Sequence, residues 1–396
     1  MHPRVFVTGV GILSAIGNGT DETLDAFKNL KTGIGKLSLF QSAHANIPVA
    51  EVRLSNHELA ELAGVLTDNM PFSRNTLLAL VASKQAVHAS GWTGVREKHT
   101  GIIFATTVGG MDLNEQYYKS LLENAEHKQV IGLLDSADCT EKVAAFFGIR
   151  HHVTTISTAC SSSANAVMLG ARLIRNKHLQ RVLVGGTDSL TKFTLNGFNA
   201  LEIISPSGCR PFDRNRNGLT IGEGAAALVL ESEECADPGR IICEVSGYAN
   251  VNEAYHATAS TADGFGAILA MNRALESASL NASDISYINA HGTGTEINDL
   301  SEGIAIDKVF GSHVPPVSST KAFTGHTLGA AGAVEAVFSG MAIRDQIVLP
   351  GMNFTDPMPE LSFQPRLKVE PRRVIHVMSN SFGFGGSNTT LIFSKA

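Results

Sequence analysis

Cys160 is the residue of this sequence whose surroundings best fit a reactive nucleophile. It lies in residues 157–165 (STACSSSAN), between an apolar segment typical of a strand and a segment typical of a helix. A thiol just before a helix N-terminus lies near free N–H groups and the positive end of the helix dipole, which lower its pKa. We therefore expect an activated thiolate at Cys160. The alternative is a buried structural cysteine, the common state of cysteine in globular proteins.

Two histidines also follow apolar segments. His291 lies in NAHGTGT, after a predicted strand, and the hydroxyls of Thr293 and Thr295 are suited to hydrogen-bond an extended polar ligand. His326 lies where a glycine-rich turn leads into a predicted helix of very small residues, 328–343 (LGAAGAVEAVFSGMAI). The alternative for His291 is a strand-end histidine whose ring is satisfied by a backbone carbonyl.

A lysine and a glutamate flank the second histidine. Lys321 precedes His326 by five residues, and Glu335 follows in the predicted helix. A lysine in apolar surroundings needs an anion, and Glu335 is the nearest plausible partner in sequence. A direct chemical role for Lys321 and a purely structural ion pair both fit the pattern.

A glycine-rich segment near the C-terminus completes the set of candidate site residues. Residues 380–388 read NSFGFGGSN, with Phe384 between Gly383 and Gly385. Such glycine density lets backbone N–H groups point at a ligand oxygen, as in an oxyanion hole.

Together, one candidate nucleophile and two histidines at strand ends indicate covalent catalysis. The residues leave the acyl chemistry open, and they also allow a zinc site built from Cys160, His291 and His326. That option is disfavoured because no two of these candidate ligands have the short spacing typical of structural zinc.

The elements that must position these residues alternate along the chain. Apolar strand-like runs and amphipathic helical patterns follow one another, which predicts an α/β protein with largely buried strands. A polar stretch at residues 231–239 (ESEECADPG) predicts a boundary between two halves, 1–234 and 235–396. Residues 154–168 and 376–390 each run a strand into a turn of small residues, a faint echo between the halves.

The composition excludes several classes of protein. The 396 residues are 43% hydrophobic and 17% charged, as in a compact enzyme, and the net charge of −6 argues against nucleic-acid binding. Five cysteines without repeated spacing do not suggest a disulfide framework. We expect no signal peptide and no membrane span, and we therefore expect a reducing cytoplasm.

Taken in order, the motifs TACSSS, NAHGTGT, TKAFTGHTLGAAGAVEA and NSFGFGGSN resemble the β-ketoacyl-[acyl-carrier-protein] synthases of the elongating Cys-His-His type. The resemblance covers essentially the whole chain. It implies the thiolase fold, in which two similar mixed-sheet halves form a five-layered α-β-α-β-α arrangement. The N-terminal half would carry the cysteine, and the C-terminal half would carry both histidines and the GFGG loop.

The resemblance also implies roles for the candidate residues. Cys160 would be the acylated nucleophile, and His291 and His326 would promote decarboxylation and stabilise the enolate. The N–H groups of Cys160 and Phe384 would form the oxyanion hole, and Phe384 would also move as a gate. Lys321 would organise the site with the help of Glu335.

The implied substrates are carried on the phosphopantetheine arm of an acyl carrier protein, with no metal or organic cofactor. Thr293 and Thr295 match residues that contact this arm, and Gly383 and Gly385 match the substrate-binding loop. The reaction would be a decarboxylative Claisen condensation between an acyl group on Cys160 and malonyl-carrier. A basic surface would dock the acidic carrier.

The wording of two motifs also resembles polyketide-type synthases. These motifs are Ser161–Ser163 after the cysteine and GTGTEIND after the first histidine, and the second is similar to the aryl-polyene synthases. The segments 203–208 and 231–239 are also short compared with those of the usual fatty-acid enzyme. Fatty-acid elongation and an aryl-polyene or polyketide pathway are therefore both open, as are a homodimer and a heterodimer with a chain-length-factor-like subunit. A non-catalytic partner subunit is disfavoured by Cys160, and a non-decarboxylating thiolase is disfavoured by the paired histidine motifs.

Overall fold

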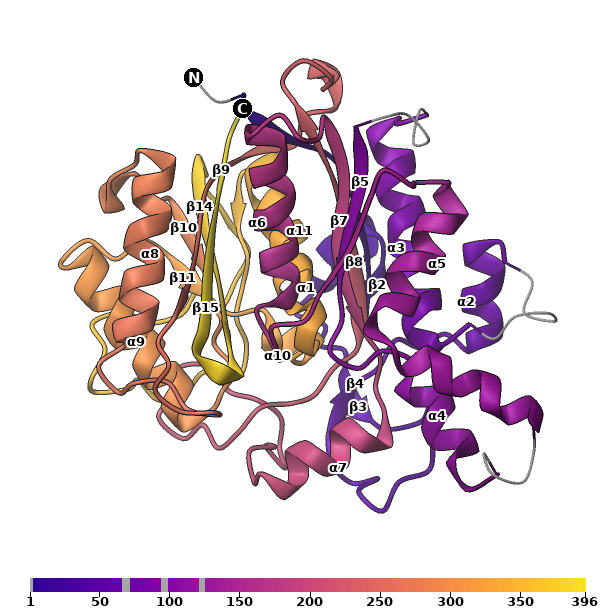
Figure 1. Ribbon diagram of the computed structural model, residues 1–396. Coiled ribbons are helices and arrows are strands. Elements are labelled where there is room, and N and C mark those ends of the chain that lie inside the picture. Colours follow the sequence, from indigo (N-terminus) through magenta and orange to yellow (C-terminus); the bar gives the residue numbers. More distant parts are fainter. Residues whose placement is uncertain (1–2, 66–71, 94–98, 121–124) are drawn as a thin grey trace.

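The chain builds the same five-stranded pattern twice. The computed structural model describes residues 3–65, 72–93, 99–120 and 125–396 (Figure 1). The strands of the N-terminal half are β1 (Val5–Ser14), β5 (Thr100–Ala105), β6 (His152–Ile156), β7 (Arg181–Asp188) and β8 (Gly224–Ser232). Those of the C-terminal half are β9 (Cys243–Asn252), β10 (Tyr287–Asn289), β11 (Val317–Ser318), β14 (His376–Gly383) and β15 (Ser387–Ser394).

The two sets of strands have the same topology. The N-terminal order is β6-β5-β7-β8-β1 and the C-terminal order is β11-β10-β14-β15-β9, so that corresponding strands occupy corresponding places. In each half the first three strands of this order pair in parallel and the remaining neighbours pair antiparallel. The predicted similarity of the halves is confirmed, but the echo between residues 154–168 and 376–390 is wrong, because β6 corresponds to β11 and β14 corresponds to β7.

Helices and sheets form five layers. Two central helices, α6 (Ser162–Arg175) and α11 (Ala331–Asp345), lie between the sheets and contact each other. The outer layer of the N-terminal half contains α3 (Arg74–Ser90) and α5 (Ser136–Phe147), and that of the C-terminal half contains α8 (Phe265–Ala278) and α9 (Glu296–Phe310) (Figure 1). The thiolase fold expected from the resemblance is confirmed.

The halves are joined along the sheet as well as through the central helices. Phe6 and Val7 of β1 pair antiparallel with Glu244 and Cys243 of β9, which links both sets of strands into one sheet. The predicted boundary at residues 234 and 235 falls in the connection between β8 and β9. Because the sheet is continuous there, the division into two separate units stays a prediction.

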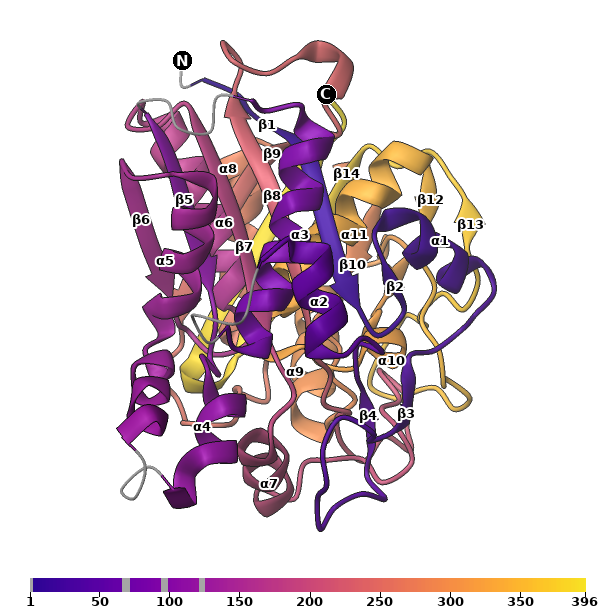
Figure 2. The ribbon, with the colours of Figure 1, turned by 90° about the vertical axis from the view of Figure 1, so that its right-hand side faces the viewer.

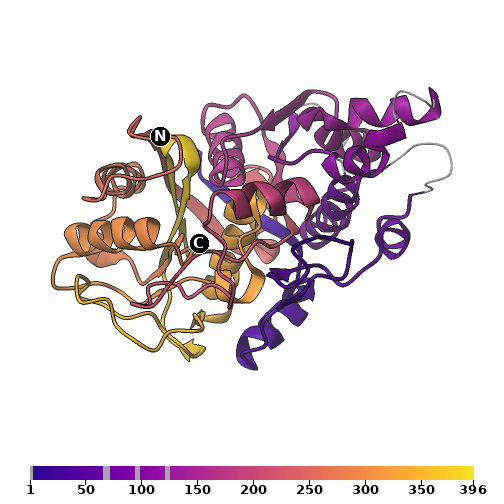
Figure 3. The same cartoon turned by 90° about the horizontal axis from the view of Figure 1, so that it is seen from below.

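The chain also forms shorter elements besides these strands and helices. They are α1 (Thr20–Lys28), α2 (Asn56–Ala63), α4 (Met111–Tyr117), α7 (Lys192–Ala200), α10 (Lys321–Thr324), β2 (Gly17–Asn18), β3 (Ile34–Lys36), β4 (Pro48–Ala50), β12 (Ile347–Val348) and β13 (Glu370–Pro371). Of these, α4, α7, β3 and β4 lie at the lower end in Figures 1 and 2. Seen from below, α7 lies in front of the junction between the purple N-terminal half and the orange C-terminal half (Figure 3).

The small residues of α11 let the two central helices approach closely. The helix is buried from Ala331 to Ile343, and a Cβ added at Gly332 would lie 2.6 Å from the backbone nitrogen of Ala164 on α6. The hydroxyl of Ser163 accepts a hydrogen bond of 2.8 Å from the N–H of Ala333. Packing and a direct hydrogen bond therefore fix the N-termini of both helices relative to each other.

Two further expectations concern the chain as a whole. All five cysteines are free thiols, which agrees with the predicted absence of a disulfide framework. Within the residues that the structure describes, no helix has both the length and the apolar character needed to cross a membrane.

We predict that Gly332→Ala destabilises the protein by about 2 kcal/mol, because the new methyl group overlaps the α6 backbone and the helices must separate. Urea unfolding followed by circular dichroism measures the change. The control is Gly197→Ala in α7, where an added Cβ meets no atom within 4 Å. It should leave stability unchanged or raise it by up to about 1 kcal/mol. Equal stabilities of the two variants would show that the helix contact is not this tight.

Candidate active site

Cys160, His291 and His326 come together although they are far apart in the sequence. A sulfur or ring nitrogen from each residue lies within 4.8 Å of the corresponding atoms of the other two, and all three residues are buried. The two imidazole rings meet edge to face, with centroids 5.3 Å apart. The cluster predicted from strand ends is therefore assembled in the folded chain.

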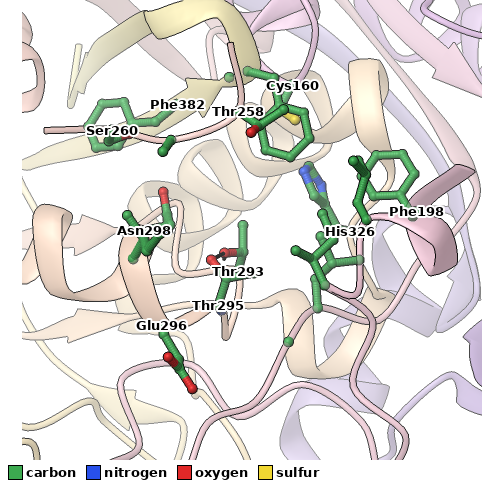
Figure 4. A pocket seen from close by; sticks show the side chains of 18 of the residues that line it. Cys160, Phe198, Thr258, Ser260, Thr293, Thr295, Glu296, Asn298, His326 and Phe382 are labelled. Atoms are coloured by element: carbon green, nitrogen blue, oxygen red, sulfur yellow. Dashed lines mark hydrogen bonds between the residues drawn. The ribbon is translucent and has the colours of Figure 1, made fainter. Parts of the chain in front are cut away.

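The internal repeat explains this convergence. Cys160 lies between β6 and the central helix α6, and His326 lies at the corresponding place between β11 and the central helix α11. Because the N-termini of these helices are adjacent, the two residues face each other, and the His326 ring points toward the Cys160 sulfur (Figure 4). His291 follows β10, which is the neighbour of β11 in the sheet.

The three serines after Cys160 each form a hydrogen bond that fixes the turn containing Cys160. Ser161 Oγ donates to Ser387 Oγ at 2.9 Å, which ties the turn to the glycine-rich loop. Ser162 Oγ accepts from the N–H of Thr158 at 2.8 Å. Together with the Ser163 bond to α11, these contacts give each serine a structural partner.

The predicted thiolate at Cys160 is wrong. Burial raises the pKa of the Cys160 thiol to about 11, and the N–H of Phe384 and the charge of Lys321 oppose this only in part. The helix N-terminus suggested a lowered pKa, but removal of the sulfur from water is the larger effect. The resting nucleophile is therefore a neutral thiol that must lose its proton during attack.

Both histidines are neutral for the same reason. Burial lowers the pKa of His291 and of His326 well below the ordinary value, and the positive charge of Lys321 lowers both further. Among the described residues, neither ring nitrogen of His326 has a hydrogen-bond partner. A neutral imidazole carries one N–H and one free lone pair, so His326 is able both to donate a hydrogen bond and to accept a proton.

Lys321 and Glu335 form the predicted ion pair. Both are buried, and the ammonium group contacts the Glu335 carboxylate. Lys321 Nζ also donates to the carbonyl oxygen of His291 at 2.6 Å and lies 3.3 Å from His291 Nδ1. An ammonium group has no acceptor, so Nδ1 of His291 must accept and its Nε2 carries the hydrogen.

This geometry assigns Lys321 a positioning role. It does not line the cavity described below, and it acts on the site through the ring and main chain of His291. Burial raises the pKa of Glu335 to about 7, and Lys321 opposes the rise. The ion pair therefore sets the tautomer of His291 as well as satisfying two buried charges.

Two buried carboxylates that the sequence analysis missed hold the His291 turn. Glu302 on α9 accepts hydrogen bonds from the N–H groups of His291 and Gly292, both at 2.8 Å. Asp299, one turn earlier, accepts from the N–H of Gly294 at 3.1 Å. Their spacing of three residues on the helix that follows NAHGTGT was the available signal.

A third missed carboxylate, Asp188 at the end of β7, holds the His326 turn. Its Oδ2 accepts from the N–H of Gly329 at 2.6 Å, and its Oδ1 accepts from the hydroxyl of Thr106 at 2.6 Å. The turn has Leu328 at φ +51°, a strained conformation for a side chain of this size. Nothing in the local sequence indicates this contact, because the partners are 141 residues apart.

The glycine-rich loop lies against the nucleophile. A Cβ at Gly383 would lie 3.1 Å from the backbone nitrogen of Cys160, and the N–H of Phe384 acts to lower the pKa of the Cys160 thiol. The ring of Phe384 stacks on Phe198 of α7, with centroids 6.1 Å apart. Gly385 lies outside the cavity lining, where its N–H donates to the carbonyl of Ala257 at 2.7 Å.

A cavity of about 470 Å³ connects this cluster to the surface. Thr293 and Thr295 lie along it, and their hydroxyls are 2.9 Å apart (Figure 4). Other lining residues, which the sequence analysis did not identify, are Phe198, Leu201, His256, Thr258, Ile297 and Asn298. The cavity combines apolar walls with hydroxyl groups, so it fits an elongated ligand that carries a few polar groups.

Comparisons with known proteins agree with this geometry. Family models described as "Beta-ketoacyl synthase, N-terminal domain" and "Beta-ketoacyl synthase, C-terminal domain" match residues 2–236 and 242–355. The chain is 32% identical to 3-oxoacyl-[acyl-carrier-protein] synthase 2 of Staphylococcus aureus, over 100% of this chain and 99% of that one. It is 34% identical to a putative polyketide beta-ketoacyl synthase 1 of Streptomyces halstedii, over 100% and 98%.

A solved structure supports the same relationship. The structure described as "The ishigamide ketosynthase/chain length factor" superposes with a TM-score of 0.92 at 29% identity and covers 100% of both chains.

We predict that Cys160 reacts slowly with iodoacetamide at neutral pH. A pKa of about 11 leaves a thiolate fraction of about 10⁻⁴ at pH 7, so the rate should rise about tenfold per pH unit from pH 7 to 10. Site-resolved mass spectrometry of the modified peptide measures this rate. In urea-unfolded protein the same thiol should titrate near the ordinary value of about 8.5. A rate that is already constant below pH 8 in folded protein would restore the thiolate interpretation.

Proposed function

The chain belongs to the β-ketoacyl synthase family, and on that premise we propose that it extends an acyl chain by decarboxylative condensation with malonyl-carrier protein. One observation carries the proposal. A thiol and two neutral imidazoles, with donor atoms within 4.8 Å of one another, lie at a cavity that is lined by two threonine hydroxyls. This arrangement fits one group that holds an acyl chain and two that stabilise an enolate.

In the first half-reaction, Cys160 attacks the thioester carbonyl of an acyl-carrier. The thiol proton passes to a ring nitrogen of His326, whose nitrogens are free of other partners, and then to the departing carrier sulfur. The N–H groups of Cys160 and Phe384 are the donors for the oxyanion of the tetrahedral intermediate. The products are acyl-Cys160 and the free carrier thiol.

In the second half-reaction, malonyl-carrier occupies the same cavity. Loss of CO2 leaves an enolate, whose oxygen accepts hydrogen bonds from the neutral N–H groups of His291 and His326. The enolate carbon attacks acyl-Cys160, the carbon–sulfur bond breaks, and the thiolate takes a proton from solvent. Because decarboxylation supplies the carbanion, no strong base is needed, and we propose that the reaction uses no metal or organic cofactor.

Thr293 and Thr295 are suited to hold the phosphopantetheine arm, since they lie along the cavity between the cluster and the surface. The S. aureus relative is named for an acyl-carrier-protein substrate, which supports a carrier protein as the partner here. Phe384 would act as the gate, because its ring and that of Phe198 both line the cavity and stack on each other. A basic docking surface for the carrier stays a prediction.

A further question is which biosynthetic pathway this condensation serves. The relative named 3-oxoacyl-[acyl-carrier-protein] synthase 2 and the one named a putative polyketide beta-ketoacyl synthase 1 match almost equally well, at 32% and 34% identity. We propose a polyketide-type pathway, including the aryl-polyene type, because the ishigamide ketosynthase/chain length factor superposes over the whole chain. The intact Cys160, His291 and His326 favour a catalytic chain over a non-catalytic partner. We also propose a cytoplasmic location, which five free thiols support.

We further propose that the protein is a dimer, with a second copy or a chain-length-factor-like subunit. Within the described residues, β6 pairs only with β5, so its outer edge offers free backbone N–H and C=O groups. Exposed apolar side chains lie on and near this edge, among them Val153 at 39% and Phe146 at 39% exposure. An edge strand with an apolar border is suited to pair with another chain.

Condensation is tested with acyl-carrier and malonyl-carrier. The wild type should give acylated Cys160 with acyl-carrier alone, and then CO2 and a β-ketoacyl product two carbons longer when malonyl-carrier is added. Cys160→Ala should form neither the adduct nor the product. Mass spectrometry of protein and carrier measures both steps. Product formation by Cys160→Ala would refute the nucleophile, and condensation of two acetyl thioesters without CO2 release would refute decarboxylation.

The dimer is tested with Val153→Asp, which puts a charge on the free edge of β6. We expect the variant to sediment as a monomer in analytical ultracentrifugation, because an unpaired carboxylate at an apolar interface costs several kcal/mol. The matched control is Leu367→Asp, at a residue of similar exposure (38%) away from β6. A wild-type monomer, or identical behaviour of both variants, would contradict this interface.

A further inference from the structure

The cluster of Cys160, His291 and His326 has the composition of a metal site. One sulfur and two imidazole nitrogens are the donors that zinc-class cations prefer. The three donor atoms lie within 4.8 Å of one another, so a point exists no more than about 2.8 Å (4.8/√3) from all of them. Zinc bonds to sulfur and imidazole measure about 2.3 and 2.1 Å. A shift of roughly half an ångström by each side chain would therefore bring all three into bonding range.

His326 provides a second, independent observation. It is 2% exposed, and among the described residues neither of its ring nitrogens has a hydrogen-bond partner. A buried imidazole without a partner is rare, because an unmade hydrogen bond in the interior is costly. The ring faces the Cys160 sulfur and the cavity, so the free lone pair is directed at the place where a cation would bind (Figure 4).

Lys321 acts against such binding. Its ammonium group lies 3.3 Å from His291 Nδ1 and thereby keeps the ring hydrogen on Nε2, the atom available to a cation in the cluster. Coordination through Nε2 requires that this hydrogen move to Nδ1, where it would face the ammonium group. The positive charge of Lys321 also repels a divalent cation bound to the same ring.

We propose that the resting site is a latent, inhibitory site for zinc-class divalent cations, with Cys160, His291 and His326 as ligands, and that Lys321 limits its affinity. On binding, a metal–sulfur bond forms and the thiol proton leaves to solvent. The Nε2 hydrogen of His291 moves to Nδ1, where it faces the ammonium group of Lys321.

Cation binding also depends on the stage of the catalytic cycle, an inference that rests on the proposed function. A thioester sulfur is a poor ligand compared with a thiolate. Zinc-class cations therefore bind the free enzyme and not the acyl-enzyme, so inhibition is strongest when acyl-carrier is scarce.

The test uses the full chain and Co²⁺ as a spectroscopic probe for Zn²⁺. Titration of the wild type should produce a thiolate-to-cobalt charge-transfer band with a stoichiometry of one, and Zn²⁺ should abolish the band by displacement. Cys160→Ala, and wild type first alkylated at Cys160 with iodoacetamide, should show no band. Cys235→Ala, at a partly exposed cysteine outside the site, is the matched control and should bind like the wild type. None of these readouts needs condensation, so a failure of the proposed function would leave them interpretable.

The role of Lys321 is tested with the double variant Lys321→Met/Glu335→Gln, which removes the ammonium group without leaving an unpaired carboxylate. We expect its Co²⁺ dissociation constant to fall by about tenfold or more, because the positive charge that repels the cation and keeps the hydrogen on Nε2 of His291 is gone. If this variant does not fold, Lys321→Gln replaces it. In wild type, Zn²⁺ should inhibit acylation of Cys160, and EDTA should restore it.

Two results would overturn the proposal. The first is a wild type without a charge-transfer band, or with a band that survives in Cys160→Ala, since either means that the cluster does not bind the cation. The second is a Co²⁺ dissociation constant that is unchanged or higher in the Lys321 variants, because Lys321 would then not limit the affinity of the site.

Discussion

The two central helices approach each other so closely that the backbone of α11 at Gly332 leaves no room for a Cβ against α6. This contact determines where the chemistry takes place. Because α6 and α11 occupy equivalent places in the two repeats, their N-termini meet, and a residue from the turn that precedes each helix lines the same cavity. Cys160 comes from one repeat and His326 from the other. A larger residue in the contact would separate a nucleophile from its proton acceptor without altering either side chain.

Burial then decides the protonation state of the site. Cys160, His291 and His326 all lie out of water, and burial disfavours the charged form of each, so the thiol and both imidazoles are neutral. Charge is kept instead at the Lys321–Glu335 pair, where two ions compensate each other. The result is a site that creates charge only during reaction, as the thiolate forms or as CO2 leaves. Fixed N–H donors stabilise such transient charge better than water, because they need no reorganisation.

The sequence was sufficient for those parts of the site whose signals are local. Cys160 and His291 each follow an apolar strand, and His326 lies in a glycine-rich turn before a helix of small residues. Lys321 and Glu335 lie in one segment, so the positions of these residues and the ion pair could be predicted. The alternation of strands and helices predicted the α/β class, and the family motifs implied the repeated fold. The predicted thiolate failed because helix position is a local property, whereas the loss of solvent around the sulfur depends on both repeats. Asp188 and Phe198 were missed because their partners, Gly329 and Phe384, are distant in sequence.

The short ligand spacing that is typical of structural zinc sites does not apply to Cys160, His291 and His326. Short ligand spacing is typical of structural zinc because a small domain folds around the metal, and two ligands then come from one turn. Here the three donor atoms are brought together by β10, by the turn before α6 and by the turn before α11, so the fold itself bears the cost of bringing them together. Spacing therefore carries no information about this cluster. A condensing site and a metal site with the same three residues differ in the group that contacts those residues, which here is Lys321 beside His291. Lys321 holds a hydrogen on the His291 nitrogen that a cation would need, and in the proposed mechanism His291 donates that same hydrogen to the enolate oxygen.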